Sequence, residues 1–158
     1  MEPVQFLNVI CRGLVGHVSY LATCSLSTVY SEYLLYEPIA RIAQAKGYVV
    51  RCEVPVVSGK KGPGDHRRFD FLLKKDELAI GLEVKWLQKG GSRDVTKDIQ
   101  KLRDAEVHYR YLLVFGRGSI VENATMKADG EPLSWQSKTV RWDARKTDYA
   151  ARWLRVTS

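Results

Sequence analysis

Two carboxylates and one ammonium in neighbouring apolar segments have the types and spacing of a site for a hard divalent cation. In residues 78–87, strand alternation directs Glu83 and Lys85 to one face, beside the small residues Ala79 and Gly81. A Glu-x-Lys pair taken alone is typical of a salt bridge on a solvated face. The preceding segment decides between the two interpretations.

That preceding segment, residues 68–73, carries Asp70 among aromatic and aliphatic residues. Aspartate has a poor strand propensity and is costly to bury without a partner. The short turn at residues 75–77 predicts that the two strands pair as a hairpin, with Asp70 near Glu83. Because two close carboxylates repel each other unless a cation neutralises them, Mg²⁺ or Mn²⁺ is the expected occupant.

A third carboxylate is predicted from the helix that follows Ser31. Helical angles place Glu32 at the margin of the buried stripe, whereas Glu37 lies nearly opposite, on the polar face. Glu32 can therefore reach the sheet and Glu37 cannot. The alternative for Glu32 is an ordinary first-turn acid, favoured by the helix dipole. The stripe itself consists of Leu35, Ile39, Ile42 and Ala43.

The elements that must position these residues follow the order helix, helix, three strands, helix, strand. Apolar periodicity predicts helices at 3–22, 31–46 and 94–107, and strands at 48–57, 68–74, 78–87 and 109–115. Weaker signals indicate a strand at 139–142 and a short helix at 148–154. The continuous apolar run at 109–115 is typical of a buried central strand. The chain of 158 residues is thus expected to be one α/β domain with a mixed sheet covered by helices.

The pattern resembles the PD-(D/E)XK, or restriction-endonuclease-like, nuclease superfamily. The matching features are Glu32 on the first core helix, Asp70 on the second strand and Glu83-Val84-Lys85 on the third, in the family's αβββαβ order. The resemblance covers roughly residues 30–116, which leaves an N-terminal helix and a C-terminal extension at 117–158. No proline stands immediately before Asp70, which departs from the family's motif, but that proline is often missing in the family. Asp65, in a Gly- and Pro-rich loop, is a weaker candidate for the first acid.

The resemblance implies metal-dependent hydrolysis of phosphodiester bonds in nucleic acid, with DNA expected as the substrate in preference to RNA. Asp70, Glu83 and the backbone carbonyl of Val84 would hold Mg²⁺ or Mn²⁺, and Glu32 would be a further ligand, direct or through water. Lys85 would orient or deprotonate the attacking water, or neutralise developing charge. In the next helix, where the family often carries a polar helper, Asp98 and Lys101 flank the apolar stripe. We expect surface positions for both, with the helper role as the alternative.

The basic composition is compatible with a nucleic-acid partner. The 25 Lys and Arg residues exceed the 18 Asp and Glu residues, giving a net charge of +7, which either attracts a polyanion or only maintains solubility. An exposed hairpin loop is often basic for no functional reason, so the alternatives stay open. The candidate nucleic-acid contacts are Lys60, Lys61, Arg67 and Arg68 around the loop, together with Lys101. The tryptophans of the C-terminal extension are expected to pack on the core rather than to stack on bases.

Other sequence features exclude some classes of protein. No segment approaches the roughly 20 apolar residues of a membrane span, so no membrane partner is expected. Cys11, Cys24 and Cys52 are expected to be reduced, buried thiols of a cytoplasmic protein. A nuclease this small would need a partner subunit to cut both strands of a duplex, which makes a homodimer possible. The alternative function is an inactive nuclease-fold module that binds nucleic acid or a protein partner, as in a defence or toxin and immunity complex.

Overall fold

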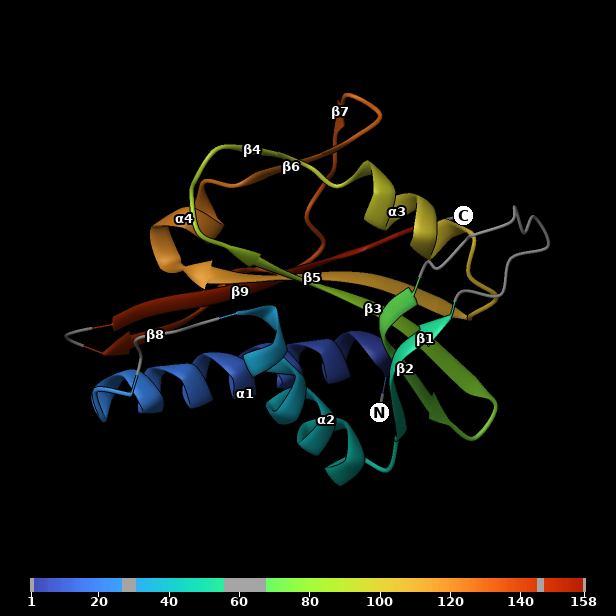
Figure 1. Cartoon of the computed structure of the whole chain (residues 1–158), viewed down its shortest axis with the longest axis horizontal. Helices are drawn as coiled ribbons and strands as arrows, with labels where there is room; N and C mark the ends of the chain where they lie inside the picture. The colour runs from blue at the N-terminus through green and yellow to red at the C-terminus, as the bar shows by residue number, and fades with distance from the viewer. Residues whose placement is uncertain (1, 27–30, 56–67, 145–146, 158) are drawn as a thin grey trace.

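A six-stranded mixed sheet organises the fold, and the computed structural model describes residues 2–26, 31–55, 68–144 and 147–157 (Figure 1). Counted across the sheet, the first three strands pair antiparallel, the third and fourth pair parallel, and the fourth, fifth and sixth pair antiparallel. The protein is therefore of the mixed α/β class. In order across the sheet the strands are β1 (Val49–Pro55), β2 (Arg68–Lys75), β3 (Leu78–Leu87), β5 (Tyr109–Arg117), β9 (Thr147–Arg155) and β8 (Val140–Ala144).

Helices cover both faces of this sheet (Figure 1). On one face lie α1 (Pro3–Thr23) and α2 (Tyr36–Ala45), the latter preceded by the 3-10 turn η1 (Glu32–Leu35). On the other face lies α3 (Thr96–Arg103), within the crossover that two parallel neighbouring strands such as β3 and β5 require. The crossover brings α3 over the end of β3, where Glu83 and Lys85 lie.

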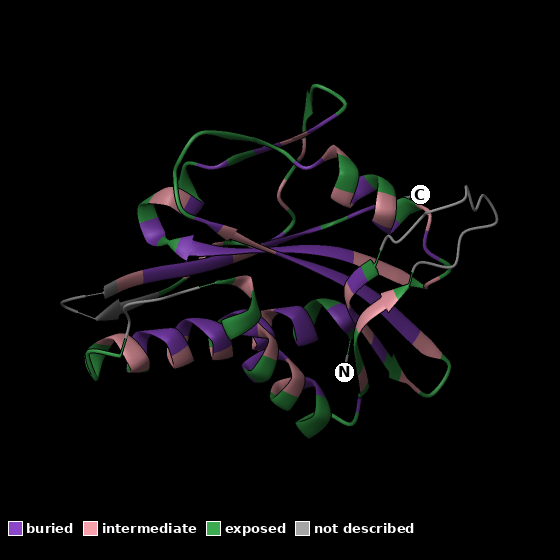
Figure 2. Cartoon of the chain, viewed as in Figure 1, coloured by how far each residue is buried: buried purple, intermediate pink, exposed green. Residues whose placement is uncertain are grey.

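The two cores follow from alternation along β5, which is buried on both faces (Figure 2). Leu113 and Phe115 face α1 and join its buried stripe, whereas Leu112 and Val114 belong to the core under α3. The predicted buried central strand is thus confirmed, and it extends to Arg117.

Local signals explain where several elements begin and end. Pro3 occupies the first turn of α1, where its missing N–H costs no hydrogen bond. Gly47, with φ +82°, follows α2 in the left-handed conformation that terminates helices. Between β2 and β3, the two-residue turn of Asp76 and Glu77 also begins with a positive φ, +50° at Asp76. The predicted hairpin of β2 and β3 is therefore confirmed.

A small second sheet supports α3 and was not predicted. It contains β4 (Ser92–Asp94), β6 (Thr125–Ala128) and β7 (Glu131–Pro132), and the short helix α4 (Gly118–Glu122) precedes β6. The backbone N–H of Val95, just before α3, donates to the carbonyl of Lys127 in β6. The sheet thus fixes the start of the helix that carries Asp98 and Lys101.

Three predicted helices differ from the observed elements. In the one expected at 31–46, Glu32–Leu35 form the 3-10 turn η1 and the α-helix covers only Tyr36–Ala45. The helix expected at 94–107 is shorter, because Val95 precedes its first turn and the chain leaves the helix after Arg103. The helix expected at 148–154 is wrong: these residues form β9, between β5 and β8. Backbone pairing on both sides overrides the helical propensity of this segment. The strand expected at 139–142 is confirmed as β8.

The thiol and tryptophan predictions are confirmed in part. All three cysteines are free, but only Cys11 is buried, and burial raises its pKa to about 12. Cys24 and Cys52 are exposed, so the expectation of buried thiols is wrong for both. As expected, Trp153 belongs to the core on the α1 face of the sheet and Trp135 packs against the core under α3. The side chain of Trp142 lies outside the described part. In the described ranges, no helix is long and apolar enough to cross a membrane.

Candidate functional site

The pairing of β2 with β3 stops at Phe71 opposite Leu82. Beyond this pair, side-chain carboxylates accept the hydrogen bonds of the β3 backbone. The N–H of Val84 donates to Asp70 Oδ2 at 2.7 Å, and the N–H of Trp86 donates to Glu32 Oε1 at 3.0 Å. We call this place, where β2 diverges from β3 and side-chain oxygens replace strand pairing, the β2–β3 fork. At the fork, two predicted acids from distant segments, Asp70 and Glu32, bind backbone N–H groups of β3 that lie two residues apart.

Asp70 is held on its second oxygen by a tyrosine. Asp70 Oδ1 accepts from the hydroxyl of Tyr36 at 2.7 Å, and the ring of Tyr36 packs on Phe71 with 4.6 Å between centroids. The same hydroxyl lies 3.1 Å from Oε1 of Glu53, a β1 residue with φ +52°. Burial raises the pKa of Tyr36 well above its usual value, and the hydrogen bonds and negative charges of Asp70 and Glu53 add to this effect. Tyr36 therefore remains a proton donor, and its single hydrogen serves one carboxylate at a time.

Glu83 is the deepest charged group of the site, with 1% of its surface exposed. Its Oε1 accepts from the backbone N–H of Asp70 at 3.3 Å, and its Oε2 lies 2.6 Å from Nζ of Lys101. Burial, followed by the charge of Asp70, raises the pKa of Glu83 to about 8, although Lys101 opposes the shift. One ammonium does not offset this burial, so the site favours the arrival of further positive charge.

Lys85 and Lys101 are joined through Asp98. Lys85 Nζ lies 3.2 Å from Asp98 Oδ2, and Lys101 Nζ lies 3.7 Å from Asp98 Oδ1. Burial lowers the pKa of Lys85 as the largest single effect, but Asp98, Glu32 and Glu83 together raise it above its usual value. Lys85 is therefore a stable cation in this arrangement.

The expectation that Asp98 and Lys101 are surface residues is wrong. Each side chain is only 16% exposed. Lys101 contacts Glu83, and Asp98 contacts Lys85. The helical angle placed them at the edge of the apolar stripe, and their side chains extend from that edge over the sheet toward Glu83 and Lys85. A buried charge is stabilised by a partner of opposite charge, which Lys101 provides for Glu83 and Asp98 for Lys85.

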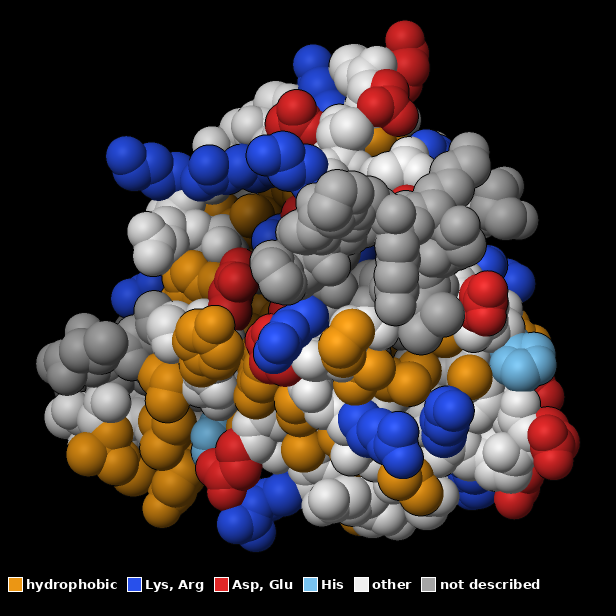
Figure 3. Space-filling view, turned by 45° about the vertical axis from the view of Figure 1, so that its right-hand side comes forward, with side chains coloured by type: hydrophobic (Ala, Val, Ile, Leu, Met, Phe, Trp, Pro, Cys, Tyr) orange, Lys and Arg blue, Asp and Glu red, His pale blue; other side chains and the backbone are white. Residues whose placement is uncertain are grey.

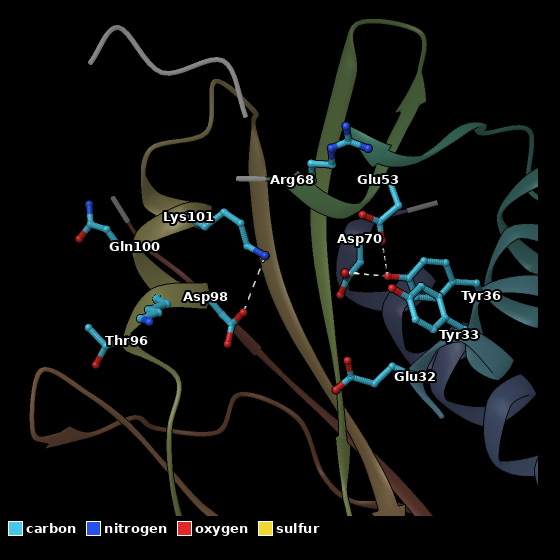
Figure 4. A pocket seen from close by; sticks show the side chains of 11 residues that line it. Glu32, Tyr33, Tyr36, Glu53, Arg68, Asp70, Thr96, Asp98, Gln100 and Lys101 are labelled. Carbon is cyan, nitrogen blue, oxygen red and sulfur yellow. Dashed lines mark hydrogen bonds and ion pairs between the residues drawn. The ribbon is translucent and has the colours of Figure 1, made fainter. Parts of the chain in front are cut away.

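A cleft of about 690 Å³ opens at the fork (Figure 4). One wall comes from α3, and the other comes from η1, α2, β1 and β2. On this side of the molecule acidic and basic side chains are interspersed (Figure 3). The lining residues are Glu32, Tyr33, Tyr36, Glu53, Arg68, Asp70, Thr96, Lys97, Asp98, Gln100 and Lys101.

The predicted residues fall into two groups. Glu32, Asp70, Glu83 and Lys85 meet around the fork, and the exposed Arg68 lines the cleft. Of the other positions proposed for nucleic-acid binding, Lys101 lines the cleft and pairs with Glu83. The remaining ones lie outside the described residues, as does the rival acid: these are Lys60, Lys61, Arg67 and Asp65. Glu37, predicted to face solvent, is exposed and pairs with Arg41.

Sequence reasoning missed Tyr36 and Glu53. Glu53 is an acid within a strand-like segment, which is the signal that identified Asp70, and it could have been found in the same way. Tyr36 follows Glu32 by four residues, the spacing of one helical face, but a tyrosine at that position is more often a core residue.

No three His, Cys, Asp or Glu side chains within the described ranges form a group already arranged to hold a metal ion. Comparison of the chain with protein-family models, curated proteins and solved structures finds no match. The function therefore has to be argued from the chemistry of the fork and its cleft.

Proposed function

We propose that this chain is a metal-dependent nuclease with a restriction-endonuclease-like core, which hydrolyses phosphodiester bonds of nucleic acid, with DNA as the expected substrate. The observation that carries the proposal is the position of Asp70, which lines the cleft, beside the buried Glu83 at the β2–β3 fork. The order η1 and α2, β1 to β3, α3 and β5 agrees with the αβββαβ order of the superfamily and supports the proposed core.

The donors at the fork suit Mg²⁺ or Mn²⁺. Because the N–H of Val84 points to Asp70, the carbonyl of Val84, which lies on the same side of the strand, is directed to the fork as well. Asp70, Glu83 and this carbonyl would hold the cation, with Glu32 as a further ligand, direct or through water. Mg²⁺ keeps several waters and is often bound through one or two carboxylates and substrate phosphate. A preformed group of three acids is therefore not required.

When bound, the cation would lower the pKa of a water molecule and stabilise charge on the scissile phosphate. The raised pKa of Lys85 favours a charge-neutralising role over proton abstraction, since a general base must first lose its proton. Asp98 fixes the Lys85 ammonium, and Tyr36 fixes one oxygen of Asp70. The chain's own residues thus orient the acids and supply one cation for the phosphate.

The test is cleavage of duplex, single-stranded and branched DNA, and of RNA, with Mg²⁺ or Mn²⁺ added. Asp70→Asn and Lys85→Met are expected to reduce the rate about 100-fold or more, because the first removes a carboxylate that would hold the cation and the second removes a positive charge that would stabilise the transition state. Glu37→Gln is the matched control, since it alters an exposed acid outside the cleft and should leave the rate unchanged.

Absence of cleavage of all four substrates with either metal would contradict the proposal. Salt-sensitive binding of nucleic acid without metal-dependent cleavage would instead indicate the inactive binding module. Co-purification with an acidic protein, without nucleic acid, would indicate a protein partner.

A further inference from the structure

Tyr33 is a large aromatic side chain that the fold leaves 70% exposed. It lies in η1, directly after Glu32, and lines the cleft. Its ring is held by Tyr36, with 5.3 Å between centroids and 53° between ring planes. Tyr36 in turn is fixed by Phe71 and Asp70, so Tyr33 rests on a supported aromatic neighbour while most of its own surface is exposed.

The opposite wall of the cleft has a different chemistry. It comes from α3 and includes Lys97. Thr96 and Gln100 also belong to this wall, but the Thr96 hydroxyl bonds to Asp94 and the Gln100 amide bonds to Asp104, and in Figure 4 both side chains point away from the fork. Lys97 and Gln100 are exposed, as is Arg68, which lines the cleft from the start of β2. The cleft thus combines an accessible aromatic ring with cations that can contact phosphate.

Those features fit one nucleotide better than a segment of duplex. A volume of about 690 Å³ lies in the range of sites that enclose a small organic ligand, the size class of a single nucleotide. Aromatic side chains beside cations bind bases by stacking on their faces. In a duplex those faces are covered by neighbouring base pairs, so only an unpaired or extruded base offers its face to a tyrosine.

We propose that Tyr33 is a stacking platform for an unpaired base, which makes single-stranded or locally unpaired nucleic acid the substrate class of this cleft. The inference rests on the proposed function and specifies it. The base lies against Tyr33, where the carboxylate of Glu53 can accept hydrogen bonds from its amino groups. The backbone lies toward Lys97 and Arg68.

The experiment uses a short single-stranded oligonucleotide that contains 2-aminopurine, whose fluorescence falls when the base stacks. Binding is measured in EDTA at low salt, so no hydrolysis occurs. The wild-type chain is expected to bind and quench the single strand and to leave unchanged the fluorescence of the matching duplex, in which the base is already stacked. Tyr33→Ala is expected to weaken binding about 5- to 150-fold and to abolish quenching.

Three variants control the result. Tyr33→Phe keeps the ring and is expected to behave as the wild type, whereas Tyr33→Gln, a second variant without a ring, should behave as Tyr33→Ala. Tyr20→Ala removes another exposed tyrosine, 67% exposed on α1 and absent from the cleft lining, and should change nothing. Circular dichroism establishes that each variant is folded.

Binding and quenching that are unchanged in Tyr33→Ala and Tyr33→Gln would overturn the inference, as would equal affinity for duplex and single strand. The same proteins are assayed for cleavage with Mg²⁺, which separates the two proposals. Cleavage that needs Asp70 and not Tyr33 would leave the nuclease and remove the stacking platform. Tyr33-dependent quenching with no cleavage would leave the platform and remove the nuclease.

Discussion

The carboxyl group of Glu83 should make the stability of the protein fall as the pH rises. Burial and the neighbouring Asp70 raise its pKa from the usual 4.5 to about 8 in the folded state. Between these values the folded state binds a proton that the unfolded state has released, so the contribution is complete below pH 4.5 and is lost above about pH 8. The interval corresponds to roughly 5 kcal/mol at about 1.4 kcal/mol per pH unit.

Glu83→Gln removes the ionisable group and keeps its shape. The assay is urea unfolding in EDTA for both proteins at about pH 5 and about pH 8.5. Other groups titrate in both proteins and cancel in the comparison, so the wild type should lose several kcal/mol more than Glu83→Gln between these pH values. Glu37→Gln, at an exposed acid, should follow the wild type. Parallel profiles for the wild type and Glu83→Gln would refute the reasoning.

The same group links the proton to the cation. If Asp70 and Glu83 hold Mg²⁺, the cation competes with the proton on Glu83, and its affinity should increase as the pH approaches about 8. Added Mg²⁺ should therefore restore much of the stability that the wild type loses at alkaline pH, and it should have little effect on Glu83→Gln. Equal stabilisation of both proteins by Mg²⁺ would place the cation elsewhere.

Two further predictions concern a lysine and two glycines. Lys101→Met removes the ammonium 2.6 Å from Glu83, so calorimetry at alkaline pH should show about tenfold tighter Mg²⁺ binding, whereas weaker binding would mean that Lys101 supports the cation. Gly116→Ala should lower the free energy of unfolding by about 1–3 kcal/mol, because a Cβ would lie 2.6 Å from the carbonyl oxygen of Leu87. At Gly16 in α1 an added Cβ would have no neighbour within 4 Å beyond the backbone of its own helix, so Gly16→Ala should raise the free energy of unfolding by about 0.5–1 kcal/mol. The reverse order of the two variants in denaturant titrations would contradict the packing.

Local patterns were sufficient to predict the strands of the site and the residues they carry. Period-2 alternation placed Glu83 and Lys85 on the α3 side of β3, and the short turn before β3 predicted the hairpin that brings Asp70 beside them. The prediction that Glu32 reaches the sheet and Glu37 faces solvent is confirmed, although Glu32 lies in the 3-10 turn η1 and not in the α-helix that the angles assumed. These predictions succeeded because each depends on neighbours a few residues away in the chain.

Features that depend on distant contacts could not be predicted. β9 has a helix-like sequence, and only its pairing with β5 and β8 makes it a strand. The divergence of β2 from β3 is a tertiary feature, so the replacement of strand pairing by Asp70 and Glu32 was not foreseen. Lys101 and Asp98 were assigned to the surface because helical angles give direction and not the reach of a side chain.

The contact between α1 and β9 has a consequence for how the chain folds. The indole N–H of Trp153 donates to Asn8 Oδ1 at 3.0 Å across 145 residues, and β9 fills the position between β5 and β8. During synthesis the apolar stripe of α1 emerges long before the strand on which it packs. Such non-local closure slows folding and exposes apolar surface to aggregation. Residues 147–155 must therefore be synthesised before the six-stranded sheet that carries the β2–β3 fork can be completed.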